Sequence, residues 1–265
     1  MKKYVYILLY LIIGQLYIFA IPAIGIWYET QGFNGFKFIS ENELQILTEP
    51  FQSKIFEDGT YHYELSYEEG LPYIFISGNG VKRYFLLLSN EQACYFYDTK
   101  TGELVISAEH TKAAIEPFVI YKRDKIRASS ELREGKTVYS VENLSTEILL
   151  PWVPAGGKNG IGATLTIHDM YGEFLILGSG YVSVKNRALW TKNARPKKLK
   201  IQYKKTGIVK YVDLKDTPDL QTIVMYTDED YKNQTRGGDI VITIMDVYEG
   251  TTYSDVCINI LVEKT

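Results

Sequence analysis

Short apolar stretches separated by turn residues run along most of this chain, and no helical stripe accompanies them in the second half. The stretches there are TLTIHDM, EFLILGSG, LKIQYKK, GIVKYVDL, QTIVMYT, DIVITIMDVY and VCINILVE. Strands this short, with turns about 8–12 residues apart, are typical of a β-sandwich. The chain's 22 tyrosines fit this interpretation, because Tyr favours half-buried pleated surfaces. The pattern predicts an all-β protein.

Residues 33–107 have the pattern of consecutive hairpins. LPYIFIS and VKRYFLLL flank a Gly-Asn-Gly turn at 78–80, and ACYFYD and ELVISA flank a second tight turn at 99–102. Turns of this kind join neighbouring antiparallel strands. This half is therefore expected to form an antiparallel meander, as a small barrel or a curled sheet.

Alternation within the strands predicts which side chains face the core. Tyr61, Tyr63 and Tyr67 alternate with polar residues and are expected on the core face, with the lining of a ligand cavity as the alternative. In the stretch 239–247 both phases of the alternation are apolar, which predicts a central strand buried on both faces. Trp152, beside a glycine-rich loop, is also predicted to be a core residue.

The first residues predict a targeting segment rather than part of the fold. Two lysines precede an uncharged, mostly apolar stretch, residues 4–28, as in a signal peptide. Ala23 and Gly25 suit a cleavage site, so the mature chain is expected to begin at Ile26. An uncleaved anchor is the alternative, because an apolar stretch of more than ~18 residues can span a bilayer. Both interpretations predict an exported protein (periplasmic, secreted or at the cell surface), with membrane contact only through this segment.

The charge of the chain argues against a nucleic-acid partner. The net charge is −3, and the one basic run consists of Lys197, Lys198, Lys200, Lys204 and Lys205. On a strand, alternation leaves such lysines on a solvated face. A nucleic-acid-binding protein is expected to present a broader basic field than this run provides.

No catalytic motif is present in the sequence. His62, His110 and His168 lie in unrelated segments, and there is no Gly-x-Ser-x-Gly elbow. The sequence therefore predicts a protein that is not an enzyme, with hydrolase activity in the N-terminal half as the weakest alternative.

The two cysteines do not form a zinc motif. Cys94 and Cys257 lie far apart, each within an apolar run, and no CxxC or His/Cys cluster exists. An exported chain could pair them in a disulfide. Two buried free thiols are equally compatible with their surroundings.

Several separated motifs in the second half occur in a recognisable order. They are IRASSEL, YSVENL, Trp152 with Gly160-Ile161-Gly162, Gly180-Tyr181, NARPKKLKI, LKDTPDLQT and DVYEGTTYSDVCI. With them the region from about residue 125 to 262 resembles the NADase-type glycan-binding domain, the translocation domain of NAD glycohydrolases. This family is related to the discoidin, or coagulation-factor type C, modules. The resemblance implies a galactose-binding-like jelly-roll β-sandwich that binds a glycan or another cell-surface ligand. The residues before it do not resemble a catalytic domain, so no NADase activity is implied.

These patterns together predict the organisation of the chain. Residues 1–25 are expected to be the signal peptide or anchor, and residues 26–108 a β-rich domain of unknown role. A connector is expected at 109–124, followed by the discoidin-like domain at 125–265.

A sugar site needs an aromatic face for the C–H surface and polar groups for the hydroxyls. Loops at one end of a sandwich are the usual place to present both. The candidate ligand-binding residues are Tyr181, Trp190, Asn193, Arg195, Tyr248, Tyr253 and Asp255. Trp190 lies in a polar stretch predicted to be a loop, where it is either an exposed contact or a lid over the core. For Arg195 a structural salt bridge is the alternative to ligand binding.

Some features favour a module that keeps the fold without a sugar site. The family pattern has acidic residues where this chain has Pro154, Ala163 and Ile260. A structural or protein-interaction module is therefore the alternative function.

The glycines of the loop at 156–162 are expected to adopt positive φ rather than to bind phosphate, since no Gly-Lys-Ser/Thr follows. No cofactor is predicted; calcium, bound with Asp255 or Asp246, is the alternative.

Overall fold

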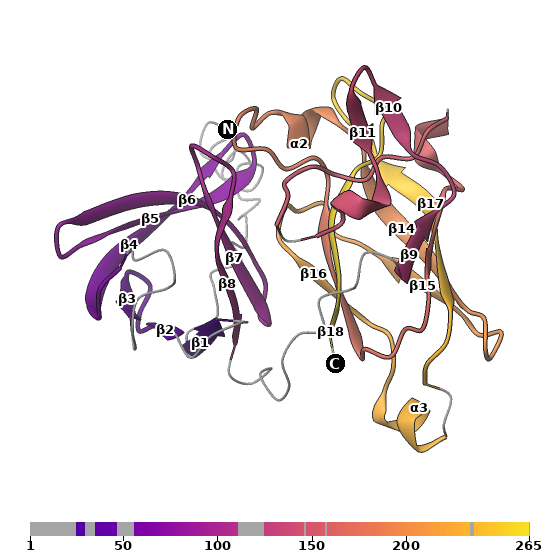
Figure 1. Cartoon of the computed structure of the whole chain (residues 1–265), viewed down its shortest axis with the longest axis horizontal. Coiled ribbons are helices and arrows are strands. Elements are labelled where there is room, and N and C mark those ends of the chain that lie inside the picture. The colour runs from indigo at the N-terminus through magenta and orange to yellow at the C-terminus, as the bar shows by residue number, and fades with distance from the viewer. Residues whose placement is uncertain are drawn as a thin grey trace, which may run out of the picture.

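The computed structural model describes residues 25–29, 35–46, 56–110 and 125–264, without residues 146, 157, 234 and 235. The predicted targeting segment, apart from Gly25, lies outside the described residues. The predicted connector also lies outside them beyond His110. Figure 1 shows two β units side by side, one from each half of the chain. No helix in the described ranges combines the length and the apolar character needed to cross a membrane.

The N-terminal unit is a closed barrel of eight antiparallel strands in chain order. The strands are β1 (Gly25–Glu29), β2 (Gly35–Phe38), β3 (Glu43–Ile46), β4 (Gly59–Glu68), β5 (Leu71–Gly78), β6 (Val81–Ser89), β7 (Ala93–Asp98) and β8 (Leu104–His110). Each strand pairs with the next, and β1 also pairs with β8. The expected antiparallel meander is confirmed, in its barrel form.

Aromatic side chains fill the interior of the barrel. The buried ones are Trp27, Phe36, Phe38, Phe56, Tyr61, Tyr63, Phe85 and Phe96. Tyr61 donates its hydroxyl to the carbonyl of Glu57 at 2.9 Å, and Tyr63 donates to the carbonyl of Ser40 at 2.9 Å. Both rings can be buried because their hydroxyls are satisfied at the barrel rim. Their predicted place in the core is confirmed.

The C-terminal unit is a sandwich of a five-stranded and a three-stranded sheet. The larger sheet has the order β15 (Val209–Asp213), β14 (Arg195–Tyr203), β17 (Ile240–Tyr248), β12 (Thr164–Ile167) and β9 (Ile126–Ala128). The smaller sheet has the order β16 (Gln221–Val224), β13 (Phe174–Ser179) and β18 (Ile258–Lys264). The segments between these strands contain a hairpin, two short helices and two 3₁₀ turns. The hairpin consists of β10 (Leu132–Glu134) and β11 (Thr137–Tyr139), the helices are α2 (Leu189–Lys192) and α3 (Asp228–Lys232), and the turns are η2 (Val141–Asn143) and η3 (Lys158–Gly160). The all-β class with a C-terminal sandwich is confirmed.

Trp152 and the glycine-rich loop hold one end of the sandwich core. Trp152 is fully buried, and its indole Nε1 donates to the carbonyl of Ser130 at 3.1 Å. Gly160 has a φ of 69°, and a Cβ there would lie 2.2 Å from Cγ1 of Val256 and 2.8 Å from Cγ of Pro154. Only glycine fits so close an approach at that φ. The predicted core role of Trp152 and the positive φ at Gly160 are therefore both confirmed.

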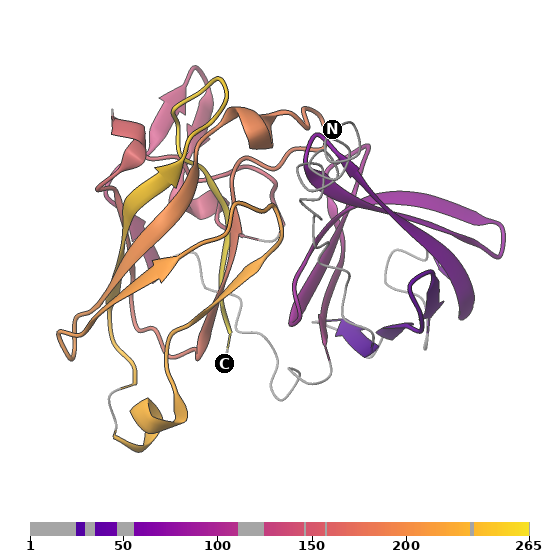
Figure 2. The ribbon, with the colours of Figure 1, turned by 180° about the vertical axis from the view of Figure 1, so that it is seen from behind.

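The barrel packs on the outer face of the three-stranded sheet. One hydrophobic cluster joins the two units: it contains Leu71, Tyr73, Leu86, Leu88, Ala93, Tyr95 and Tyr97 from the barrel and Ile176, Val182, Trp190, Leu220, Ile260 and Val262 from the sandwich. As a result β18 is buried along its whole length. Figures 1 and 2 show the barrel beside this sheet and the five-stranded sheet on the far side.

The sequence predicts that β17 is buried on both faces, and this prediction is wrong. The strand buried on both faces is β18. In β17, Ile240, Ile242 and Ile244 are buried, but Met245 on the opposite face is 40% exposed. The apolar alternation was correct, but it does not show which sheet a second domain covers. An isolated sandwich would expose Ile176, Ile260 and Val262 to solvent.

Polar contacts also cross the junction between the units. The Leu220 amide donates to the Ser89 carbonyl at 3.2 Å, and Asn90 Nδ2 donates to Thr222 Oγ1 at 3.1 Å. Arg187 of the sandwich forms an ion pair with Glu68 of β4, and its guanidinium lies 4.8 Å from the ring centroid of Tyr73. The junction thus combines an apolar centre with directed contacts at its edge.

The two cysteines are buried free thiols. Cys94 belongs to the barrel core and Cys257 to the C-terminal unit. Burial raises the pKa of both thiols well above the ordinary value. The free-thiol alternative is therefore the one realised, and neither thiol is activated as a nucleophile.

Candidate ligand-binding site

One end of the sandwich brings together the segments that carry the predicted site. Ala194 forms a parallel bridge with Val256, and its amide donates to the carbonyl of Asp255 at 3.0 Å. Arg195 is the register partner of Tyr248 in the β14–β17 pair. The Gly180 amide donates to the Cys257 carbonyl at 2.9 Å. The three segments around residues 180, 193 and 255 therefore lie next to one another.

Trp190 is buried between the sandwich and the barrel. It lies in α2, so the predicted loop is wrong at this point, because a four-residue helix leaves too little periodicity to detect. Only 7% of Trp190 is exposed, and its Nε1 donates to the carbonyl of Ser179 at 3.1 Å. A Cβ at Gly70 of the barrel would lie 3.4 Å from the ring, and one at Gly180 would lie 2.6 Å from it. Trp190 is therefore not an exposed contact; it covers the core, the second of the two predicted alternatives.

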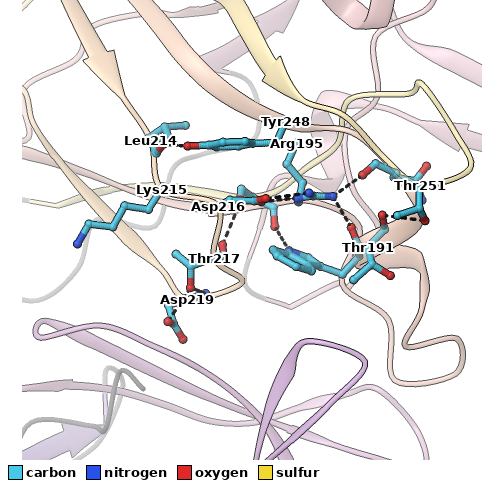
Figure 3. Close-up of polar contacts among 12 residues, drawn as sticks. Thr191, Arg195, Leu214, Lys215, Asp216, Thr217, Asp219, Tyr248 and Thr251 are labelled. Atoms are coloured by element: carbon cyan, nitrogen blue, oxygen red, sulfur yellow. Dashed lines mark hydrogen bonds and ion pairs between the residues drawn. The ribbon is translucent and has the colours of Figure 1, made fainter. Parts of the chain in front are cut away.

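Arg195 lies at the centre of a polar network shown in Figure 3. Its Nε and Nη2 donate to the two carboxylate oxygens of Asp216 at 2.6 and 3.0 Å. Its Nη1 donates to the carbonyls of Trp190 at 3.0 Å and Asn193 at 2.7 Å. The guanidinium also lies 4.6 Å from the centroid of the Trp190 ring. This is the structural salt bridge given above as the alternative, and it ties α2 to the loop before β16.

Asn193 and Tyr248 also hold backbone in place. The Asn193 side chain is buried and donates from Nδ2 to the carbonyl of Leu189 at 2.8 Å, which ends α2. The hydroxyl of Tyr248 donates to the carbonyl of Leu214 at 2.9 Å, as Figure 3 shows. With Trp190 and Arg195 these residues form a framework beneath the end of the sandwich.

Tyr181, Tyr253 and Asp255 are the accessible members of the predicted set. Tyr181 is half-buried, and its ring lies edge-on to Tyr139 with centroids 6.1 Å apart. Tyr139 donates its hydroxyl to Oε2 of Glu134 at 3.2 Å. Tyr253 is 47% exposed, two residues before the half-buried Asp255. We call Glu134, Tyr139, Tyr181 and Asp255 the loop-end cluster.

The electrostatics of the loop-end cluster favour hydrogen bonding by neutral phenols. Burial is the largest cause that raises the pKa of both Tyr139 and Tyr181. After it, Tyr181 and then Glu134 raise the pKa of Tyr139 further. For Tyr181 the hydrogen bond with Tyr139 opposes this rise, and Cys257 and Glu134 add to it. The carboxylates of Asp255 and Glu134 also act, after burial, to raise the pKa of Cys257 below the cluster. Two phenol hydroxyls and a carboxylate at one edge can exchange hydrogen bonds with the hydroxyls of a ligand.

Comparison with known families decides the relationship of this chain. The family model described as "NAD glycohydrolase translocation F5/8 type C domain" matches residues 120–262, more than half of the 265 residues. The chain belongs to this family. The match thus contains the strands of the sandwich up to residue 262 in β18, and the barrel lies outside it.

The other comparisons add little to this assignment. One similar solved structure is a cryo-EM structure of a mutant of the arabinofuranosyltransferase AftD from Mycobacteria. The two chains are 12% identical with a TM-score of 0.35, and the match covers 51% of this chain and 10% of that chain. No curated protein matches the sequence.

Two residues of the loop-end cluster were missed from the sequence. Glu134 and Tyr139 come from the β10–β11 hairpin, which Gly135 turns with a φ of 58°. Tyr139 was within the YSVENL motif, which was used only to recognise the family. Because the hairpin is more than 40 positions from Tyr181 in the sequence, only the fold places the two rings together.

The geometry of the F5/8 type C domain does not assemble the calcium ligands considered above. Asp246 is paired with Lys197 at 2.8 Å, and hydrogen bonds from Lys197 and the Val247 amide lower the pKa of Asp246. Asp255 contributes a single carboxylate. Among the described residues, no group of three or more His, Cys, Asp or Glu side chains is placed to hold a metal ion.

Replacing Asp219 with asparagine is expected to raise stability at neutral pH. Burial raises the pKa of Asp219, although the Thr217 hydroxyl, which donates to it at 2.7 Å, and Lys215 both lower it. The Asp219 charge in turn raises the pKa of Tyr67 on the barrel, and Figure 3 shows Asp219 extending toward the barrel strands.

Because its folded pKa is raised, the Asp219 carboxylate destabilises the fold above that pKa, and the penalty disappears as pH falls toward 3.8. Melting temperatures should therefore favour Asp219→Asn at pH 7 and converge near pH 4. The exposed Asp58→Asn is the control at both pH values. A difference that grows on acidification would contradict this assignment.

Proposed function

We propose that this chain is an exported, non-catalytic protein that binds a glycan or another cell-surface ligand at the loop end of its F5/8 type C domain. The observation that carries the proposal is the loop-end cluster. Tyr139 and Tyr181 bring two aromatic rings to one edge, and Glu134 is exposed beside them. Aromatic faces and hydrogen-bonding groups in that combination suit a sugar.

Preorganisation of the loop end supports the proposal. Arg195, Asn193 and Trp190 fix the backbone from which the loops leave, using hydrogen bonds between 2.6 and 3.1 Å. A ligand that binds to loops already ordered in this way does not have to supply the free energy of ordering them. In this proposal the buried residues of the predicted set support the site, and Tyr181, Tyr253 and Asp255 are the members able to touch the ligand.

Export is supported by the sequence of the first residues. The lysines before the apolar stretch and the small residues Ala23 and Gly25 suit a cleaved signal peptide. N-terminal sequencing of the protein recovered from outside the cytoplasm is expected to begin at Ile26. Recovery of the intact chain from the cytoplasm alone would contradict this part of the proposal.

A glycan array with the chain from residue 26 to 265 tests the binding function. We expect a defined subset of glycans to bind, and Tyr181→Ala to weaken Kd about tenfold, equivalent to about 1.4 kcal/mol. Tyr171→Ala, an exposed tyrosine between β12 and β13 that belongs to neither proposed surface, is the matched control and should leave this binding unchanged. A silent array, with folded protein shown by circular dichroism, would refute glycan binding at this end.

A structural or protein-interaction module is the second candidate. It is favoured by Pro154, Ala163 and Ile260 at positions that are acidic in the family pattern. Ile260, however, is fully buried in the hydrophobic cluster shared with the barrel, where a carboxylate would be an unpaired buried charge. That substitution is therefore explained by barrel packing and does not by itself argue for loss of the sugar site. A silent array is the result that favours the interaction module.

A further inference from the structure

The outer face of the five-stranded sheet carries half-exposed and exposed side chains from all five strands. Alternation sends Leu199, Ile201 and the isoleucines of β17 into the core, so the residues between them point outward. Along the edge strand β15, Val209 and Tyr211 are 39% and 59% exposed. Figure 1 shows this sheet on the side of the sandwich away from the barrel.

The strand register arranges the outward side chains in straight rows across the sheet. One row runs from Tyr211 through Lys200 and Thr243 to Thr164. These four positions lie on four neighbouring strands, so at a strand spacing of about 4.8 Å the row is about 14 Å long. The row therefore begins with an exposed aromatic ring and continues through an ammonium group and two hydroxyls.

A second row is parallel to the first. It runs from Val209 of β15 through Gln202, Val241 and Thr166 to Arg127 of β9. Its polar groups are an amide, a hydroxyl and a guanidinium, and Arg127 is exposed at the far end. The two rows together give a strip of hydrogen-bonding groups that Val209 and Val241 interrupt.

The charge of this face is positive, although the chain as a whole carries −3. Lys198 is close to Asp213, with Nζ 3.5 Å from the carboxylate. No carboxylate in the described part of the chain pairs with Lys200 or Arg127. Lys200 and Arg127 thus remain available to an anionic ligand, and the charges of Lys198 and Asp213 beside them offset each other.

We infer that this face, defined by the rows of Tyr211 and Arg127, is a second binding surface and that it holds an acidic polysaccharide. The Tyr211 ring stacks on the C–H face of one sugar. Lys200 and Arg127 pair with carboxylate or sulfate groups along the chain, and the threonine and glutamine side chains bond its hydroxyls. The surface is separate from the loop-end cluster and does not depend on a ligand there.

Affinity electrophoresis of the mature chain in gels containing polygalacturonate or dextran sulfate tests the inference, with neutral dextran as the reference. We expect retardation by at least one acidic polymer and none by dextran. The double variant Lys200→Glu/Arg127→Glu should weaken the apparent Kd about tenfold at low salt, because exposed ion pairs are screened as salt rises. Lys82→Glu/Arg83→Glu, two exposed residues near the start of β6 in the barrel, is the charge-matched control and should retain binding.

Tyr211→Ala separates recognition of a sugar from general attraction to anions. It leaves the charge unchanged and should weaken binding to the acidic polymer, while Tyr181→Ala at the loop end should not. Absence of retardation by both acidic polymers would overturn the inference. So would equal loss in Lys82→Glu/Arg83→Glu, unchanged binding in Tyr211→Ala, or equal binding to an oligothymidylate of similar charge. A silent glycan array refutes the loop-end function alone, because it leaves the Lys200 and Tyr211 results unaffected.

Discussion

Replacing Trp190 with alanine is expected to lower the free energy of unfolding by about 3–5 kcal/mol, the usual cost of emptying a buried aromatic site. The indole fills the space between Gly180 of the sandwich and Gly70 of the barrel. Alanine would remove the contact with both units, the hydrogen bond to Ser179 and the face that the Arg195 guanidinium covers. The loss therefore combines a cavity with a broken junction.

Urea unfolding followed by circular dichroism measures the effect of Trp190→Ala. Tyr253→Ala is the control, since an exposed side chain away from the core should change the free energy of unfolding by less than about 0.5 kcal/mol. Trp190→Phe should recover most of the packing but not the hydrogen bond. If Trp190→Ala cost no more than Tyr253→Ala, the barrel would not be packed on α2 in solution.

Replacing Arg195 with methionine is expected to cost about 3 kcal/mol. Breaking a buried ion pair by removing one partner costs about 3–5 kcal/mol. The lower end applies because the Asp216 side chain is 38% exposed and water can solvate the carboxylate left behind. The carbonyls of Trp190 and Asn193 also lose their donors.

Lys197→Met is the control for Arg195→Met. Lys197 pairs with Asp246 at a similar distance, 2.8 Å, but both side chains are nearly half exposed, so solvent screens the pair and its loss should cost far less than the loss of Arg195. Arg195 contacts Trp190. The double variant Arg195→Met/Trp190→Ala should therefore lower the free energy of unfolding by less than the sum of the two single variants. Equal effects of Arg195→Met and Lys197→Met, or strict additivity with Trp190→Ala, would contradict the network.

Features set by local sequence were predicted correctly. Period-2 alternation and glycine turns were enough for the all-β class, because they depend only on neighbours along one strand. Trp152 and Gly160 were also placed correctly, since a tryptophan and a glycine in a tight loop have few other roles. These assignments needed no knowledge of what lies across the sheet.

Features set by contacts between distant segments were not predictable in the same way. The residues proposed around Trp190 and Arg195 do meet at one end, but nothing in their own segments shows that the barrel and Asp216 bury them. Likewise the hydrophobic alternation of β17 resembles that of a strand covered on both faces, and only the docked barrel shows that β18 has that position. Glu134 was missed because its relation to Tyr181 exists only in the folded chain.

The hydrophobic cluster shared by barrel and sandwich couples the thermodynamics of the two domains. Residues of β5, β6 and β7 and of β13 and β18 belong to one buried cluster, so unfolding of either domain exposes apolar surface of the other. A ligand that binds only the folded sandwich stabilises it by mass action. Because the two domains share the buried cluster, the ligand also raises the unfolding temperature of the barrel. That temperature therefore reports whether a site on the sandwich is occupied.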